Sequence, residues 1–168
     1  MRRSIITISI ILSLVISLSS SIVYARFLDN YHIISFQDDP IKIQKYVEIR
    51  EIEEEYRSKI RCKVTIENGP RPVKAFAISF MFYDVFNEHL STHGGVSMSG
   101  TAGNQQGTRT WEFDPYKGWM AYTAIIYLSQ VRFSDESVWR QEGTRLSDRI
   151  IEATDLLFKE EQLKEKKE

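Results

Sequence analysis

Residues 73–86 read VKAFAISFMFYDVF, and this stretch decides the fold that we expect. Every second position carries a large apolar side chain, in the row Phe76, Ile78, Phe80 and Phe82. The residues between them are mostly small and uncharged. Alternation with a period of two indicates a β-strand, and a strand that is nearly apolar on both faces is typical of the middle of a sheet. We therefore predict a central strand here.

The preceding stretch, residues 59–67, reads KIRCKVTIE and alternates strictly between apolar and polar residues. This pattern predicts a strand with one buried face. Cys62 is the only cysteine of the chain, so no internal disulfide is available. It lies in the apolar row, which indicates a buried structural residue rather than a reactive thiol. The turn sequence NGPRP at residues 68–72 separates this strand from the next, and we predict that the two form a hairpin.

Further β-type segments are found at residues 41–52, 108–113, 119–133 and 138–139, with no helical pattern between them. This order predicts an all-β fold, an immunoglobulin-like antiparallel β-sandwich over residues 41–142. Residues 91–107 contain five glycines and no large aromatic side chain, so we expect a mobile loop there.

The first 25 residues have the features of a secretory signal peptide. Arg2 and Arg3 precede an apolar run at residues 5–18, and Val23 and Ala25 occupy the two small-residue positions of a cleavage site. The run is shorter than the roughly 20 residues that a membrane-spanning helix needs. We therefore expect export to the periplasm or beyond the cell, with no stable membrane span after cleavage. An uncleaved anchor is the alternative. Residues 26–40 are expected to be an N-terminal extension.

Residues 143–168 change in character and predict a C-terminal helix followed by a charged tail. Leu146, Ile150, Ala153 and Leu157 keep helical spacing, and Ser147 is the expected N-cap. We expect this apolar stripe to pack on the protein's own sandwich, with docking on a partner as the alternative.

Composition limits the function classes. The 168 residues include 22 basic and 23 acidic side chains, for a formal net charge of −1. A binder of nucleic acid would need a clear basic excess, so we expect no nucleic-acid partner. The length suits one domain with its own core.

No set of residues predicts catalysis or a cofactor. His89 and His93 are four apart, a spacing that places two zinc ligands together on a helix. Here the pair lies where a strand enters the glycine-rich segment, so we predict no metal site. His89 and His93 are the candidate ligands if a metal ion is bound after all. Asp84, Asp114 and Asp135 follow strands, where acids commonly end pairing, and a paired-acid hydrolase site among them stays open.

Two groups of surface residues are candidates for binding. One is a set of aromatic residues that either fill the core or form a stacking surface for sugar rings: Trp111, Tyr116, Trp119, Tyr122 and Trp139. The other is the polar row Lys59, Arg61 and Lys63, which is either a solvated strand face or a patch for an anionic ligand.

The run Phe80-Met81-Phe82-Tyr83-Asp84 resembles the signature of the FxLYD family, with Phe82 in place of leucine. The resemblance extends over about residues 41–140. It implies a small exported domain with an immunoglobulin-like sandwich, and it implies no catalytic residues. Together these features predict an exported, non-enzymatic binding module for an unknown protein or glycan partner. A carbohydrate-binding or hydrolytic protein of the cell envelope is the alternative.

Overall fold

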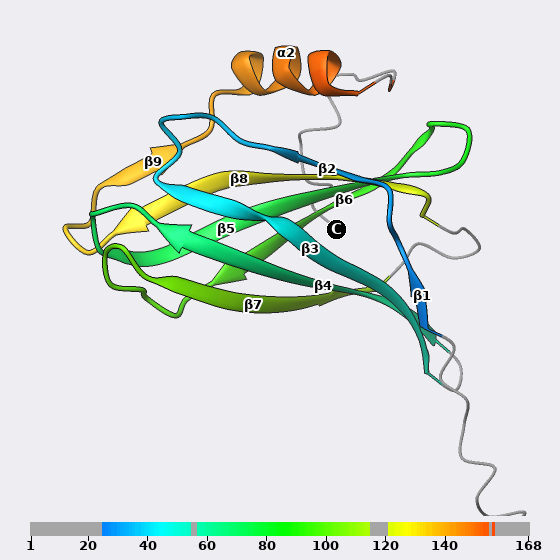
Figure 1. Cartoon of the computed structure of the whole chain (residues 1–168), viewed down its shortest axis with the longest axis horizontal. Coiled ribbons are helices and arrows are strands. Elements are labelled where there is room, and N and C mark those ends of the chain that lie inside the picture. Colours follow the sequence, from blue (N-terminus) through cyan, green and yellow to red (C-terminus); the bar gives the residue numbers. More distant parts are fainter. Residues whose placement is uncertain (1–24, 55–56, 115–120, 155, 157–168) are drawn as a thin grey trace, which may run out of the picture.

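The computed structural model describes residues 25–54, 57–114, 121–154 and 156. Two β-sheets lie face to face, and a helix lies above one of them (Figure 1). The elements, in chain order, are β1 (Ala25–Phe27), β2 (Tyr31–Ile34), β3 (Ile41–Glu54), β4 (Arg57–Asn68), β5 (Val73–Tyr83), β6 (His89–Ser97), β7 (Gln106–Phe113), β8 (Thr123–Phe133), β9 (Val138–Arg140) and helix α2 (Gly143–Ala153). The predicted all-β class is confirmed.

The two sheets differ in strand direction. The first, sheet A, has the order β1-β3-β4-β7 and is antiparallel throughout. The second, sheet B, has the order β2-β8-β5-β6, with β9 also paired to β8. In sheet B the pair β2–β8 is parallel, while the others are antiparallel. The expectation of a purely antiparallel sandwich therefore fails at one pair, because β2 starts from the same end of the sheet as β8 and runs in the same direction.

Strand β5 lies between β8 and β6, as the predicted central strand. Its first row of side chains points between the sheets and forms the core with Cys62, Val64 and other apolar residues of sheet A. Its second row faces outward, where Met81 and Tyr83 are fully buried in a smaller cluster under α2. Both faces of β5 are apolar because sheet A packs on one of them and α2 on the other.

The predicted hairpin between β4 and β5 is wrong. Strand β4 pairs with β3 and β7 in sheet A, whereas β5 pairs within sheet B. The segment at residues 69–72 carries the chain from one sheet to the other. Alternation fixes which face of a strand is buried but not which strand it pairs with, so the pattern could not distinguish a hairpin from a crossing.

The expected mobile loop at residues 91–107 is also wrong over most of its length. It contains most of β6 and the start of β7, joined by a shorter connection. Gly95 is required by packing: a Cβ there would lie 2.8 Å from Cδ2 of Trp111. The glycine thus marks a close approach between the edges of the two sheets rather than a flexible segment.

The segment that we expected to be an N-terminal extension contributes strands to both sheets. β1 pairs with residues 50–52 of β3, and β2 pairs with residues 124–127 of β8. Between them, Leu28 joins the core. Residues 26–34 are therefore part of the sandwich.

Helix α2 packs on the outer face of sheet B, as expected for docking on the protein's own sandwich (Figure 1). Leu146 and Ile150 are buried there, but Ala153 is exposed, and Leu157 lies outside the described residues. Ser147 is not the N-cap. It is buried inside the helix, which begins four residues earlier after Glu142, a residue that makes no capping bond with its side chain.

Candidate functional site

The two candidate metal ligands point to opposite faces of sheet B. His93 is paired with Phe80, whose side chain lies between the sheets, and it stacks on Phe113 with ring centroids 4.9 Å apart. His89 is paired with Tyr83 on the outer face, and its ring meets that of Tyr83 edge-on. Residues four apart on a regular strand share a face, but the register shift between Phe82 and Tyr83 turns His89 to the face opposite that of His93. Within the part of the chain that the structure describes, no group of three potential ligands is found.

The two tryptophans that the structure describes lie on opposite edges of the sandwich. Trp111 of β7 packs against Phe76 and Phe80, and its indole N–H donates to the carbonyl of Val96 at 3.0 Å. Trp139 of β9 is paired with Val131, on the side of β8 that faces away from β5. Both are half-buried against the main core. Tyr116 and Trp119 lie outside the described residues, so no shared platform can be built from the described pair.

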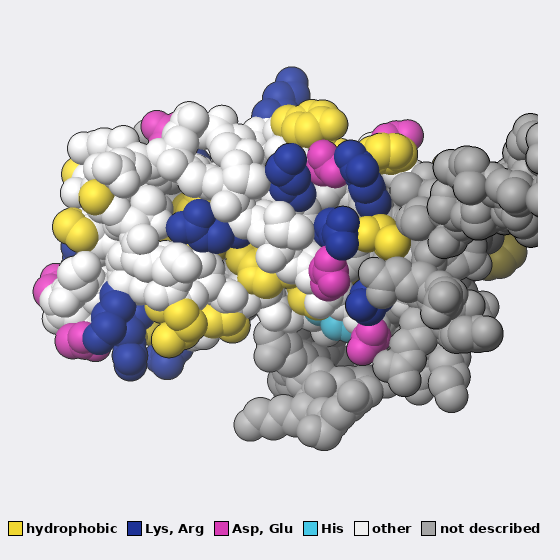
Figure 2. Space-filling model, turned by 90° about the horizontal axis from the view of Figure 1, so that it is seen from below, with side chains coloured by type: hydrophobic (Ala, Val, Ile, Leu, Met, Phe, Trp, Pro, Cys, Tyr) yellow, Lys and Arg dark blue, Asp and Glu magenta, His cyan; other side chains and the backbone are white. Residues whose placement is uncertain are grey.

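The outer face of sheet A is a polar surface of mixed charge. Figure 2 shows Lys and Arg side chains next to Asp and Glu side chains on one half of this face. Arg61 Nε donates to Glu112 at 2.8 Å, and Lys59 Nζ lies 4.0 Å from the same carboxylate. Arg50 pairs with Glu48. Acids thus neutralise much of the basic row.

Cys62 occupies the inward row as predicted and has no solvent exposure. Burial raises the pKa of its thiol far above the ordinary value, because an apolar environment disfavours the thiolate. A thiol that stays protonated is a poor nucleophile.

Two of the three candidate acids hold turns. Asp135 accepts hydrogen bonds from Ser137 and Arg71, which lower its pKa to about 2. Asp84 accepts from the backbone N–H of Phe86 and of Glu88, at 2.8 and 2.9 Å. Asp114 is exposed at the end of β7. No paired-acid site is formed by these three carboxylates, because Asp84 and Asp135 are each committed to a local turn.

The turn that Asp84 holds presents two apolar side chains to solvent. The backbone N–H of Asp84 donates to Glu88, and that of Asn87 donates back to Asp84 while Asn87 adopts a positive φ of 63°. Four hydrogen bonds therefore fix this connection between β5 and β6. At its tip Val85 is 61% exposed and Phe86 is 80% exposed. A rigid backbone lowers the entropy that such side chains would lose on binding.

A small pocket lies at the same end of the sandwich as this turn. It is lined by Arg26, Phe27, Leu28, Ile49, Glu51, Ile60 and Ala121. Ala121 is followed by Tyr122, which is 46% exposed and whose backbone N–H donates to the carbonyl of Tyr83, the last residue of β5. The segment just before β8 thus lines the pocket and is also hydrogen-bonded to the strand end from which the turn starts. Its volume suits a group of about the size of one water molecule or methyl.

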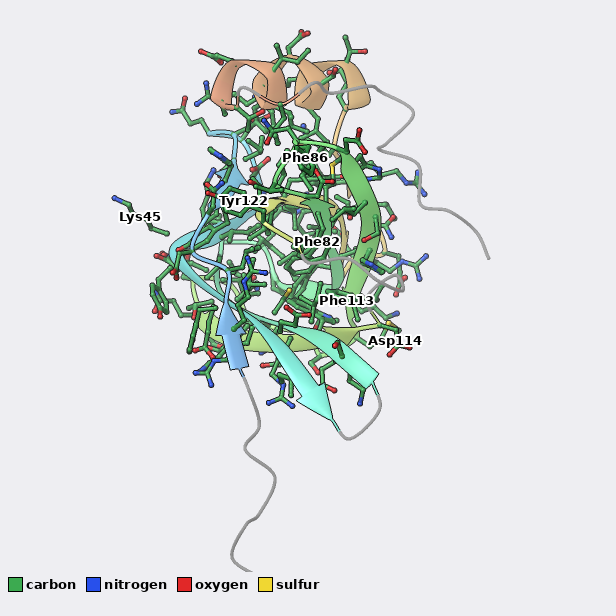
Figure 3. The ribbon with its side chains drawn as sticks, turned by 90° about the vertical axis from the view of Figure 1, so that its right-hand side faces the viewer. Lys45, Phe82, Phe86, Phe113, Asp114 and Tyr122 are labelled. Carbon is green, nitrogen blue, oxygen red and sulfur yellow. The ribbon has the colours of Figure 1, made fainter. Side chains whose placement is uncertain are left out.

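We call this surface the open end and define it by the pocket together with Val85, Phe86 and Tyr122. Figure 3 looks directly at it: Phe86 and Tyr122 lie near one another, and Phe113 and Asp114 lie below Phe86. Exposed aromatic side chains beside an apolar pocket are the usual composition of a binding surface. Among the described residues that define the open end, none is a nucleophile held next to a base.

Among the residues of the open end, sequence reasoning had singled out only Tyr122 as a candidate for binding, and it missed the turn and the pocket. One signal was present: the segment DVFNE at residues 84–88 has turn formers at Asp84 and Asn87 with two apolar residues between them. Apolar residues inside a turn have no core to enter, so they are expected at the surface. The pocket had no such signal, because its residues come from distant parts of the chain.

Comparison with protein-family models, with curated proteins and with solved structures gives no match. In the described part of the chain, no helix has the length and apolar character needed to cross a membrane.

Proposed function

We propose that this protein is an exported, non-enzymatic binding module that contacts its partner through the open end of an immunoglobulin-like sandwich. Export is supported by the signal-like sequence of residues 1–25. The immunoglobulin-like class is supported by two packed sheets with connections that cross between them. The resemblance to the FxLYD family agrees with both and adds no activity.

The observation that carries this proposal is the exposure of Phe86 on a hydrogen-bonded turn. Val85 is 61% exposed and Phe86 is 80% exposed, and both project from this one turn. Adjacent exposed apolar side chains mark an interaction surface more often than single ones such as Met98 do. Aromatic side chains are enriched among the binding hot spots of protein interfaces.

The alternative of a carbohydrate surface made of tryptophans has less support. Trp111 and Trp139 face opposite edges and contribute to the core, so they do not share one sugar-stacking plane. A hydrolytic role is likewise not favoured, because the candidate acids are separated and two of them hold turns.

The proposal is tested by co-purification of the tagged, full-length protein from the organism that makes it. Met98 is also 80% exposed but lies in the connection after β6, so it provides a matched control. Phe86→Ser is expected to reduce recovery of the main partner by about 10-fold or more, as loss of a hot spot does. Met98→Ser is expected to leave recovery unchanged. Equal recovery with Phe86→Ser and the wild type would overturn the proposal.

A further inference from the structure

The first strand of the sandwich begins at the bond that the signal sequence predicts to be cut. Val23 and Ala25 are the small residues of the expected cleavage site, so the scissile bond joins Ala25 to Arg26. Both residues of this bond belong to β1, where Ala25 is paired with Ile52 and Arg26 with Glu51 of β3. The expected processing site and the first strand of sheet A therefore share one peptide unit.

The backbone on the carboxyl side of this bond is held by β3. The N–H of Leu28 donates to the carbonyl of Ile49 at 3.0 Å. In an antiparallel pair, the hydrogen-bonded positions recur at every second residue. Arg26 occupies the next such position, opposite Glu51, so the nitrogen of the scissile amide faces β3.

The side chains that follow the bond are fixed as well. Leu28 is 9% exposed and belongs to the main core. The guanidinium of Arg50 lies over the ring of Phe27, 4.6 Å from its centroid. Release of the scissile bond therefore requires that Phe27 and Leu28 leave these contacts. Because both residues also line the pocket together with Arg26, the same movement takes the pocket of the open end apart.

A protease needs several residues around the scissile bond in an extended form inside its own cleft. A bond within a paired strand is cut through the fraction of molecules in which that strand has opened. In the structure of the uncut chain β1 is docked on β3, so docking does not wait for cleavage.

We propose that cleavage after Ala25 and docking of β1 exclude one another: the signal peptide is removed before β1 docks, and a chain that docks β1 first keeps residues 1–25. In the cleavage step water adds across the amide, which leaves a carboxylate on Ala25 and a free amino group on Arg26. This inference rests on the export that we propose above. It makes the order of docking and processing decide between the two fates expected from the sequence, a cleaved domain and an uncleaved anchor.

The test incubates the purified full-length chain, in detergent micelles, with a purified signal peptidase. Gel mobility and N-terminal sequencing of the product follow the cleavage. A variant with a flexible Gly-Ser spacer of about six residues between Ala25 and Arg26 keeps the small residues of the site but moves the bond away from β1. We expect the spacer variant to be cleaved at least about 10-fold faster than the wild type.

Two alanine substitutions show which part of the molecule must open. Leu28→Ala weakens the docking of β1, and it is expected to raise the cleavage rate of the chain without the spacer by about 10-fold. Ile150→Ala is the matched control, because it removes a fully buried side chain from the cluster under α2. It is expected to leave the cleavage rate close to that of the wild type. The melting temperature of each variant shows whether it is folded under the conditions of the assay.

The outcomes separate this inference from the proposed function. Equal cleavage rates of the wild type and the spacer variant overturn the inference and leave the cleavage site standing. A rate for Ile150→Ala as high as that for Leu28→Ala also overturns it, because unfolding of the whole domain would then expose the bond. If the spacer variant is not cut after Ala25, the inference fails together with export by a cleaved signal. Binding at the open end is tested independently through Phe86.

Discussion

Asp84 connects the sequence signature of β5 to the surface that we propose for binding. Its carboxylate accepts two backbone N–H groups that would otherwise lack partners in a tight turn. The four residues before it alternate between the main core and the cluster under α2. The FxLYD-like run therefore has a structural explanation: its aromatic residues fill two layers and its aspartate ends the strand in a rigid turn.

Replacement of Asp84 by alanine is expected to destabilise the protein by about 1–3 kcal/mol, since two turn N–H groups lose their acceptor. The midpoint of urea denaturation measures the effect. Asp148→Ala, an exposed acid on α2, is the control and is expected to stay within about 0.5 kcal/mol of the wild type. An unchanged midpoint for Asp84→Ala would mean that the backbone bonds hold the turn without the carboxylate.

Residue-scale prediction from sequence was successful where one face of a strand is buried. The inward position of Cys62 follows from period-two alternation alone. Gly95 misled us because a glycine gives the same sequence signal in a loop as in a strand that another side chain approaches closely. The difference depends on Trp111, which is remote in sequence.

At the scale of elements, helix α2 shows most clearly how the apolar face of an amphipathic segment is buried in this fold. Ile150 is fully buried against sheet B, while its neighbour Ile151 is 55% exposed. Arg145 also fastens the helix to the turn before β3, through a bidentate pair with Asp38 at 2.7 and 2.8 Å and a contact with the ring of Phe36. Apolar packing and a charged clamp thus act on the same helix.

Ile150→Ala is expected to cost about 2–5 kcal/mol, the usual range for a large aliphatic side chain removed from a core. Ile151→Ala removes the same atoms from a mostly exposed position and is expected to change stability by less than about 0.5 kcal/mol. Thermal unfolding of the two variants gives a direct comparison. Similar losses in both would contradict the packing of α2 on sheet B.

The Asp38–Arg145 pair predicts a specific pH dependence. The hydrogen bonds from Arg145 lower the pKa of Asp38 from 3.8 to about 2. A carboxyl whose pKa is lowered by folding stabilises the protein above its unfolded pKa, and this contribution is lost as pH falls through the folded value. Stability from the pair is therefore complete above about pH 4 and disappears towards pH 2.

Arg145→Gln is accordingly expected to lower the melting temperature at pH 6, with a difference from the wild type that narrows between pH 4 and pH 2. Arg149→Gln breaks only a pair within the helix, with Glu152, and serves as the control. If the Arg145→Gln difference is the same at pH 2 as at pH 6, the pair does not stabilise the docked helix.

At the scale of the whole molecule, the sandwich brings together residues that the sequence keeps far apart. The pocket takes side chains from β1, β3, β4 and the segments after β1 and before β8, and the exposed turn at the same end joins β5 to β6. The alternation of apolar and polar residues predicted the fold class, because it shows for each strand separately which face is buried. They did not predict the open end, because no local pattern reports which strand ends meet. Strand pairing in two sheets decides that.

The most direct measurement of the central claim, that partners bind at the open end, is site-specific photo-crosslinking in intact cells of the source organism. A benzophenone amino acid replaces Phe86 in one full-length chain and Met98 in another, two positions with the same 80% exposure. The account predicts a discrete protein adduct from position 86 and none from position 98. Adducts of equal yield at both positions, or an adduct only from position 98, would contradict it.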